Sequence, residues 1–188
     1  MKRILSFTYI VLSLLLLLYL AYPVDLSIDE FTPLPNSVKS SLSGDTVQVP
    51  DVSAYFSNNY RSLAIPFYYS QFTELNKLPL PPLRLNYPPE FAFEAIKDQT
   101  QSTYLEEFVY PMRNSLFVNG LEPFDQETHE KRYLAARDLV ADDGNAYETK
   151  VTLRYRESTL THRLITWFGI NLGTILLYMV FRRAQVHV

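Results

Sequence analysis

The pattern of apolar and polar positions divides the chain into two long apolar stretches and a mixed region between them. Residues 4–22 and residues 164–181 contain no acidic or basic side chain. A helix needs ~20 apolar residues to cross a bilayer, and each stretch is about that long. The sequence therefore predicts two transmembrane helices that flank a single polar region.

The charges beside the two stretches predict their orientation. Lys2 and Arg3 precede the first stretch, and Arg182 and Arg183 follow the second. Basic flanks tend to remain in the cytoplasm, so both termini are expected there, with residues 182–188 as a cytoplasmic tail. The central region is then extracytoplasmic. We expect a bacterial cytoplasmic membrane, and an organelle inner membrane fits the same pattern.

A cleaved signal peptide is the alternative interpretation of the first 22 residues. A basic start, an apolar run and Pro23 after it fit such a segment. However, the run is longer than the ~7 to 15 residues of a signal-peptide core, and Tyr19 stands where cleavage favours a small residue. An uncleaved signal anchor is therefore favoured, and the domain faces the same compartment in both cases.

The central region predicts an α+β domain over residues 46–163, preceded by an extended linker over residues 23–45. Its clearest strand alternates apolar Val151, Leu153 and Tyr155 with polar residues, which is the period of a half-buried strand. Because this strand lies a few residues before the second apolar stretch, the domain is expected to be membrane-proximal. Further strands are expected at residues 46–50, 63–72 and 115–118, the last ending in a turn at Asn119 and Gly120.

One main helix is predicted to cover this antiparallel sheet. It begins at Pro89, whose fixed φ suits a first helical turn, and ends at Tyr110 before Pro111. Four positions on its buried face recur every four residues: Ile96, Thr100, Tyr104 and Phe108. A weaker helical pattern covers residues 126–141, and the polar residues 142–145 predict a turn.

The second apolar stretch contains a candidate helix-packing site. Gly169 and Gly173 form a G-x-x-x-G pair that lets another helix approach closely. Asn171 lies between them, and its amide can hydrogen-bond to a neighbouring helix. The partner is either the first span or another chain, and the alternative is that glycine is merely tolerated in a membrane helix.

Charges of opposite sign flank the two spans on the extracytoplasmic side. If the spans pack together, the two sets face each other at the membrane surface and orient the hairpin, although exposed ion pairs contribute only about 0 to 1 kcal/mol each. The arginines have a competing use, which is binding anionic lipid headgroups or an acidic partner. The acidic set is Asp25, Asp29 and Glu30, and the basic set is Arg154, Arg156 and Arg163.

Composition excludes several classes of function. The chain has no cysteine, so it has no disulfide and no thiol nucleophile. Its net charge of −3 and scattered basic residues provide no surface for nucleic acid. Two acidic clusters match no metal-site spacing, and no catalytic, metal or cofactor residue is predicted. The clusters are Asp125, Glu127, His129 and Glu130, and Asp138, Asp142, Asp143, Asn145 and Glu148.

These observations favour a non-catalytic accessory or scaffolding subunit of a membrane protein complex, acting through its extracytoplasmic domain and second span. Its expected partners are the lipid bilayer and other membrane-protein subunits or a second copy of itself. The alternative is a membrane-proximal domain that binds a ligand or lipid in a pocket lined by tyrosine and phenylalanine. A weaker third hypothesis is a hydrolase centred on His129.

Overall fold

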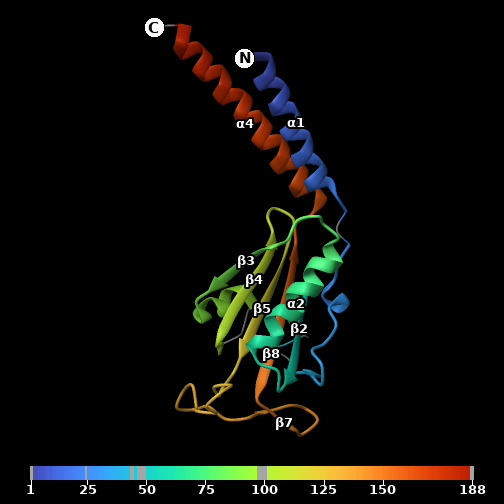
Figure 1. Cartoon of the computed structure of the whole chain (residues 1–188), viewed down its shortest axis with the longest axis vertical. Coiled ribbons are helices and arrows are strands. Elements are labelled where there is room, and N and C mark those ends of the chain that lie inside the picture. The colour runs from blue at the N-terminus through green and yellow to red at the C-terminus, as the bar shows by residue number, and fades with distance from the viewer. Residues whose placement is uncertain (1, 24, 43–44, 46–49, 97–100, 187–188) are drawn as a thin grey trace. The chain divides into compact units, whose positions relative to one another are not determined.

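The structure is a computed structural model that describes residues 2–23, 25–42, 45, 50–96 and 101–186. The chain forms two compact units (Figure 1). One contains both ends of the chain, Met1–Val24 and Ser158–Val188, and the other is Asp25–Glu157.

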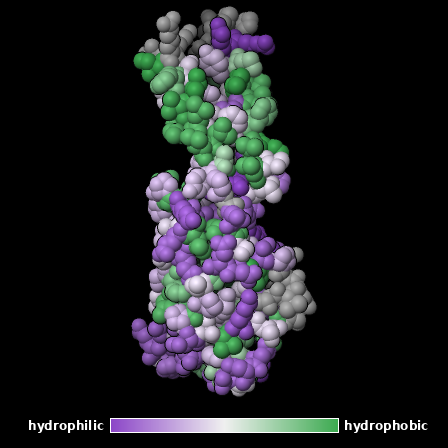
Figure 2. All heavy atoms as spheres, turned by 90° about the vertical axis from the view of Figure 1, so that its right-hand side faces the viewer, coloured by the Kyte–Doolittle hydropathy of each residue, from purple (hydrophilic) through white to green (hydrophobic). Residues whose placement is uncertain are grey.

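The unit at the chain ends consists of two helices, α1 (Lys2–Ala21) and α4 (Leu160–Val186). Both are long and apolar enough to cross a membrane, over Ile4–Ala21 and Leu160–Ala184. Most of their large apolar side chains are exposed, as the green surface over these helices in Figure 2 shows. The predicted helix in each apolar stretch is confirmed, and α4 extends beyond the predicted 164–181 at both ends.

The other unit is built on a six-stranded antiparallel sheet, which confirms the predicted α+β class. The strands lie in the order β1-β2-β8-β5-β4-β3. Their bounds are β1 Val38–Lys39, β2 Val52–Ser57, β3 Leu83–Tyr87, β4 Tyr104–Tyr110, β5 Asn114–Leu121 and β8 Thr149–Glu157. A separate short hairpin joins β6 (Leu139–Val140) to β7 (Ala146–Tyr147) through the predicted turn at residues 142–145.

Helix α2 (Arg61–Asn76) covers one face of the sheet (Figure 1). Its buried Tyr68 and Phe72 pack with Phe108 of β4 in the main core. The short helix α3 (Ala92–Ile96) packs with Leu105 and Phe117, whose side chains alternate with those of the main core along β4 and β5. The sheet therefore has an apolar cluster on each face.

The predicted helix from Pro89 to Tyr110 is wrong. The structure has a 3-10 turn at Pro89–Phe91, then α3, and β4 from Tyr104 onward, while residues 97–100 lie outside the described part. A spacing of four fits both one face of a helix and one face of a strand, because side chains of a strand alternate with period two. Pairing of all seven β4 residues with β5 determines the outcome.

The predicted strand at residues 63–72 is also wrong, since these residues lie in α2. Pro66 lacks a backbone N–H and therefore removes one helical hydrogen bond. However, Ala64, Ile65, Tyr68 and Phe72 are all buried, and their spacing of three to four residues places them on one helical face. Burial of this face against the sheet outweighs the cost of the proline, because tertiary packing provides most helical stability in proteins.

Two further local predictions are wrong. Residues 126–141 form turns, bends and extended chain rather than a helix. Asn119 and Gly120 lie inside β5 rather than at a hairpin tip, although the predicted strand at 115–118 is confirmed. Gly120 pairs with Tyr104 across the sheet, and a Cβ at this position would overlap the Tyr104 ring.

The segment expected to be a linker contributes to the folded domain from Asp25 onward. Ile28, Phe31 and Leu34 are buried in the main core, and Val38–Lys39 forms the edge strand β1. Of the strand predicted at 46–50, residues 46–49 lie outside the described part. The predicted strand around Val151 to Tyr155 is confirmed as β8, between β2 and β5.

Candidate functional site

A bridge of polar side chains joins the two terminal helices. The amide oxygen of Asn171 accepts hydrogen bonds from the Tyr9 hydroxyl at 2.6 Å and from the Ser13 hydroxyl at 2.7 Å. The indole N–H of Trp167 donates to the Ser13 carbonyl at 2.9 Å. Side-chain hydrogen bonds between membrane helices contribute about 0.6 kcal/mol each on average, so the bridge favours one register of the pair.

A second contact lies at the end of α1. The buried guanidinium of Arg163 donates to the carbonyls of Leu20 at 3.2 Å and Tyr22 at 3.3 Å. The last carbonyls of a helix lack helical donors and carry partial negative charge. Arg163 therefore caps α1, and the α1–α4 pair is held together at two levels.

The three residues of the predicted helix-packing site have different environments. Asn171 contacts α1, whereas a Cβ added at Gly169 or Gly173 would meet no atom within 4 Å. Each residue of a helix turns by about 100°, so the two glycines lie on the side of α4 opposite Asn171. The glycine pair does not join α4 to α1, and its contact with another chain stays a prediction.

Three of the charged residues predicted to meet at the membrane surface, Asp29, Arg154 and Arg156, contact other groups. Asp29 lies 3.6 Å from Lys39, and both side chains are exposed. Arg154 and Arg156 donate to the carbonyl oxygen of Ala95, at 2.8 Å and 3.2 Å. Both arginines thus bind the end of α3.

A buried carboxylate binds two arginines on the α2 side of the sheet. The Glu106 side chain in β4 is fully buried. It accepts hydrogen bonds from Arg61 Nε at 3.0 Å, Arg61 Nη2 at 2.7 Å and Arg84 Nη2 at 2.9 Å, and Arg84 Nε makes a further contact. Burial alone would raise the pKa of Glu106, but the hydrogen bonds from both arginines outweigh it and hold the pKa below its ordinary value.

A second carboxylate, that of Glu122, lies at the start of α2. The buried Glu122 accepts the backbone N–H of Arg61 at 2.5 Å and pairs with Arg132 at 3.4 Å. Arg132 also pairs with Asp125 at 3.3 Å, and Asp125 accepts the backbone N–H of Glu127. Burial raises the pKa of Glu122, whereas backbone hydrogen bonds lower that of Asp125.

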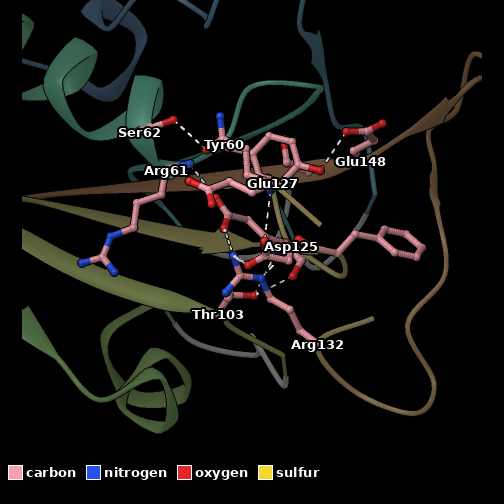
Figure 3. A network of polar contacts seen from close by, with 12 residues as sticks. Tyr60, Arg61, Ser62, Thr103, Asp125, Glu127, Arg132 and Glu148 are labelled. Carbon is pink, nitrogen blue, oxygen red and sulfur yellow. Dashed lines mark hydrogen bonds and ion pairs between the residues drawn. The ribbon is translucent and has the colours of Figure 1, made fainter. Parts of the chain in front are cut away.

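Two more hydrogen bonds fasten neighbouring chain segments to the start of α2 (Figure 3). The Tyr60 hydroxyl donates to Glu148 at 2.8 Å, and the Ser62 hydroxyl donates to Gln126 at 2.9 Å. The network thus joins α2 to the loop after β5 and to the residue before β8. These contacts explain how residues 122–132 are held without a helix.

An open recess of about 410 Å³ lies on the α3 side of the sheet. Arg156 lies over the Phe117 ring, 5.2 Å from its centroid. The Tyr87 hydroxyl donates to Glu107 at 2.7 Å, and this bond raises the pKa of Tyr87 to about 12. The recess is lined by Tyr87, Phe91, Glu94, Ala95, Leu105, Phe117 and Arg156.

The acidic groups at these sites already have partners. The buried carboxylates of Glu106 and Glu122 are engaged by arginines, and residues of the described ranges contain no group of three histidine, cysteine or acidic side chains able to hold a metal. His129 lies in the loop after β5, where its backbone N–H donates to the Asp125 carbonyl. Comparison of the chain with protein families, with curated proteins and with solved structures gave no match.

Sequence reasoning missed the arginine–carboxylate network. One signal was present, because Glu106 stands between Tyr104 and Phe108 on the inward face once residues 104–110 are treated as a strand. A charged residue on an inward face requires a partner of opposite charge. The partners could not be found, since Arg61 and Arg84 are far from Glu106 in sequence.

Proposed function

We propose that this chain is a two-pass membrane protein and a non-catalytic accessory or scaffolding subunit of a membrane complex. One observation carries the proposal. The two apolar helices bond to each other through Asn171, Tyr9 and Ser13, while their large apolar side chains elsewhere remain exposed.

The exposed apolar surface of α1 and α4 is unfavourable in contact with water. Burial of apolar area contributes about 25 cal/mol per Å², so such a surface favours lipid or the helices of other subunits. Gly169 and Gly173 add an open strip on α4 at which another helix could approach closely. This combination supports an anchor that also takes part in assembly.

The proposed orientation places both termini in the cytoplasm and the α+β domain outside it, in a bacterial cytoplasmic or organelle inner membrane. Because the chain lacks cysteine, a single introduced cysteine is a unique label. A membrane-impermeant maleimide should label Asp143→Cys in intact cells and Arg183→Cys only after lysis. The reverse result would overturn the orientation.

Purification of the tagged full-length protein from its native membrane in mild detergent tests the assembly role. Stoichiometric partners should be identified by mass spectrometry and lost in a Gly169→Leu, Gly173→Leu variant. The control Ile170→Phe adds bulk on a neighbouring exposed face of α4 and should retain them. A lone protein, unchanged by either variant, contradicts the proposal.

The recess beside α3 favours a second candidate function, a domain that binds a small ligand or lipid headgroup. Its aromatic walls and the Arg156 guanidinium suit a ligand with an apolar body and an anionic group. A native lipid extract and an anionic metabolite library, screened by thermal shift, provide the test. A hit should be lost in Arg156→Gln, and retention of the shift in that variant rejects the recess as the site.

A further inference from the structure

Strand β3 is an open edge of the sheet (Figure 1). It pairs with β4 on one side, and no other strand among the described residues pairs with its outer side. Most of its side chains are exposed, including Leu83 at 55% and Leu85 at 40%. The free backbone groups of such an edge can pair with an added strand.

The two faces of this edge differ in chemistry. Arg84 and Asn86 pair with Phe108 and Glu106, so they lie on the α2 side of the sheet. Leu83, Leu85 and Tyr87 alternate with them and lie on the α3 side. A strand added to β3 would therefore place one set of its side chains beside arginine and the other beside leucine.

The arginine side of the edge is positively charged. Arg61 and Arg84 share the carboxylate of Glu106, and the other nearby carboxylate, Glu122, is paired with Arg132. The group of Arg61, Arg84 and Glu106 therefore carries one net positive charge. Their side chains are 42% and 54% exposed, so both guanidiniums are within reach of a binding partner. Because Glu106 holds them in place, binding an anionic group costs less side-chain entropy than it would at free arginines.

We propose that β3 is the docking edge for an extended segment of a partner protein in which acidic and apolar side chains alternate. The proposal rests on the accessory-subunit function and specifies the chemistry of the partner. The acidic side chains face Arg61 and Arg84, and the apolar ones face Leu83 and Leu85. Backbone hydrogen bonds to β3 provide affinity, and the charge provides specificity.

The flanking sequence limits the segment to a short one. Two prolines precede β3 and two follow it, at residues 81–82 and 88–89, and proline cannot donate a backbone hydrogen bond. A second copy is the less favoured occupant. Pairing of two β3 strands would bring two net positive clusters to strands about 5 Å apart, where like charges destabilise the pair.

Peptide binding to the full-length protein in detergent tests the proposal. The probes are a seven-residue peptide of alternating valine and glutamate, and its counterpart with glutamine in place of glutamate. The acidic peptide should bind about tenfold more tightly by fluorescence anisotropy, because hydrogen bonds to charged groups are the stronger ones. Hydrogen exchange should show protection of the β3 amides.

Two variants test whether Arg84 causes the preference for the acidic peptide. Arg84→Gln should abolish the tenfold preference and leave binding of the glutamine peptide unchanged. Arg84→Lys keeps the charge and should retain most of the preference. The matched control Arg132→Gln removes an arginine that binds Glu122 and Asp125 instead, and it should leave the preference intact.

Three results would overturn the proposal: equal affinity for the two peptides, an equal loss in Arg132→Gln, or protection of β1 instead of β3. Protection of the β3 amides from hydrogen exchange in a dimer formed without peptide would identify a second copy as the occupant. This result would also reject the proposal. The test needs no native partner. Its failure is therefore distinct from failure of the copurification that tests the proposed function.

Discussion

Replacement of Glu106 by glutamine tests the physical account of the domain most directly. The substitution keeps the size of the side chain and removes the charge that two guanidiniums share. Removing one partner of a buried ion pair costs about 3 to 5 kcal/mol. Arg61 and Arg84 are about half exposed, and water compensates part of their charge, so we expect a loss of about 2 to 3 kcal/mol at pH 7.

The loss should depend on pH in a defined direction. The native pKa of Glu106 lies below its ordinary value, about 4.3 in an unfolded chain. The carboxylate therefore stabilises the fold fully above that value, and this contribution is lost as the pH falls through the native pKa. The difference in unfolding free energy between the two proteins should shrink below about pH 4.3.

Denaturant unfolding of the full-length protein in detergent provides the assay. The only tryptophan is Trp167 in α4, whereas most tyrosines lie in Asp25–Glu157, so tyrosine circular dichroism in the near ultraviolet reports mainly on that unit. Glu127→Gln is the control, because this exposed carboxylate forms no ion pair among the described residues, and its effect should stay within about 0.5 kcal/mol. A loss below 1 kcal/mol for Glu106→Gln, or a loss independent of pH, would refute the reasoning.

Three further predictions follow from single contacts. Gly120→Ala should destabilise the domain by about 2 kcal/mol in the same assay, because its Cβ would overlap the Tyr104 ring, whereas Gly169→Ala should be neutral. Asn171→Leu should remove two interhelical hydrogen bonds, weaken the helix pair by about 1 kcal/mol and shift the fluorescence of the tryptophan. Glu122→Gln should gain stability relative to the native protein as the pH rises from about 4.3 to the raised native pKa. Over that range the carboxyl ionises in the unfolded chain while it stays protonated in the fold, and the glutamine does not titrate. A constant difference between the two proteins across that range contradicts this.

The sequence by itself determined the features that depend on local pattern. Uninterrupted apolar runs predicted the two terminal helices, since length and hydropathy alone qualify a segment to cross a bilayer. Strict alternation predicted the strand that became β8, because a period of two has no helical interpretation. The polar residues between Ala141 and Ala146 predicted a turn that the structure has.

Tertiary structure decided every segment whose pattern fits two periods. The spacing of four between Tyr104 and Phe108 suits a helix and a strand equally, and pairing with β5 selected the strand. Residues 63–72 are rich in strand-forming aromatics, yet burial against the sheet selected α2. In both cases the deciding free energy comes from contacts with another element, which is the neighbouring strand β5 for β4 and the sheet for α2.

In the candidate site, too, the sequence indicated some residues and only the fold determined their partners. Sequence singled out Asn171, because an amide in an apolar helix requires a partner, but the identity of Tyr9 and Ser13 depended on how α1 and α4 pack. Glu106, Arg61 and Arg84 come from three different elements, and only the fold brings them within hydrogen-bonding distance. Local pattern encodes which residues must be buried or paired, whereas the partners are encoded by long-range packing.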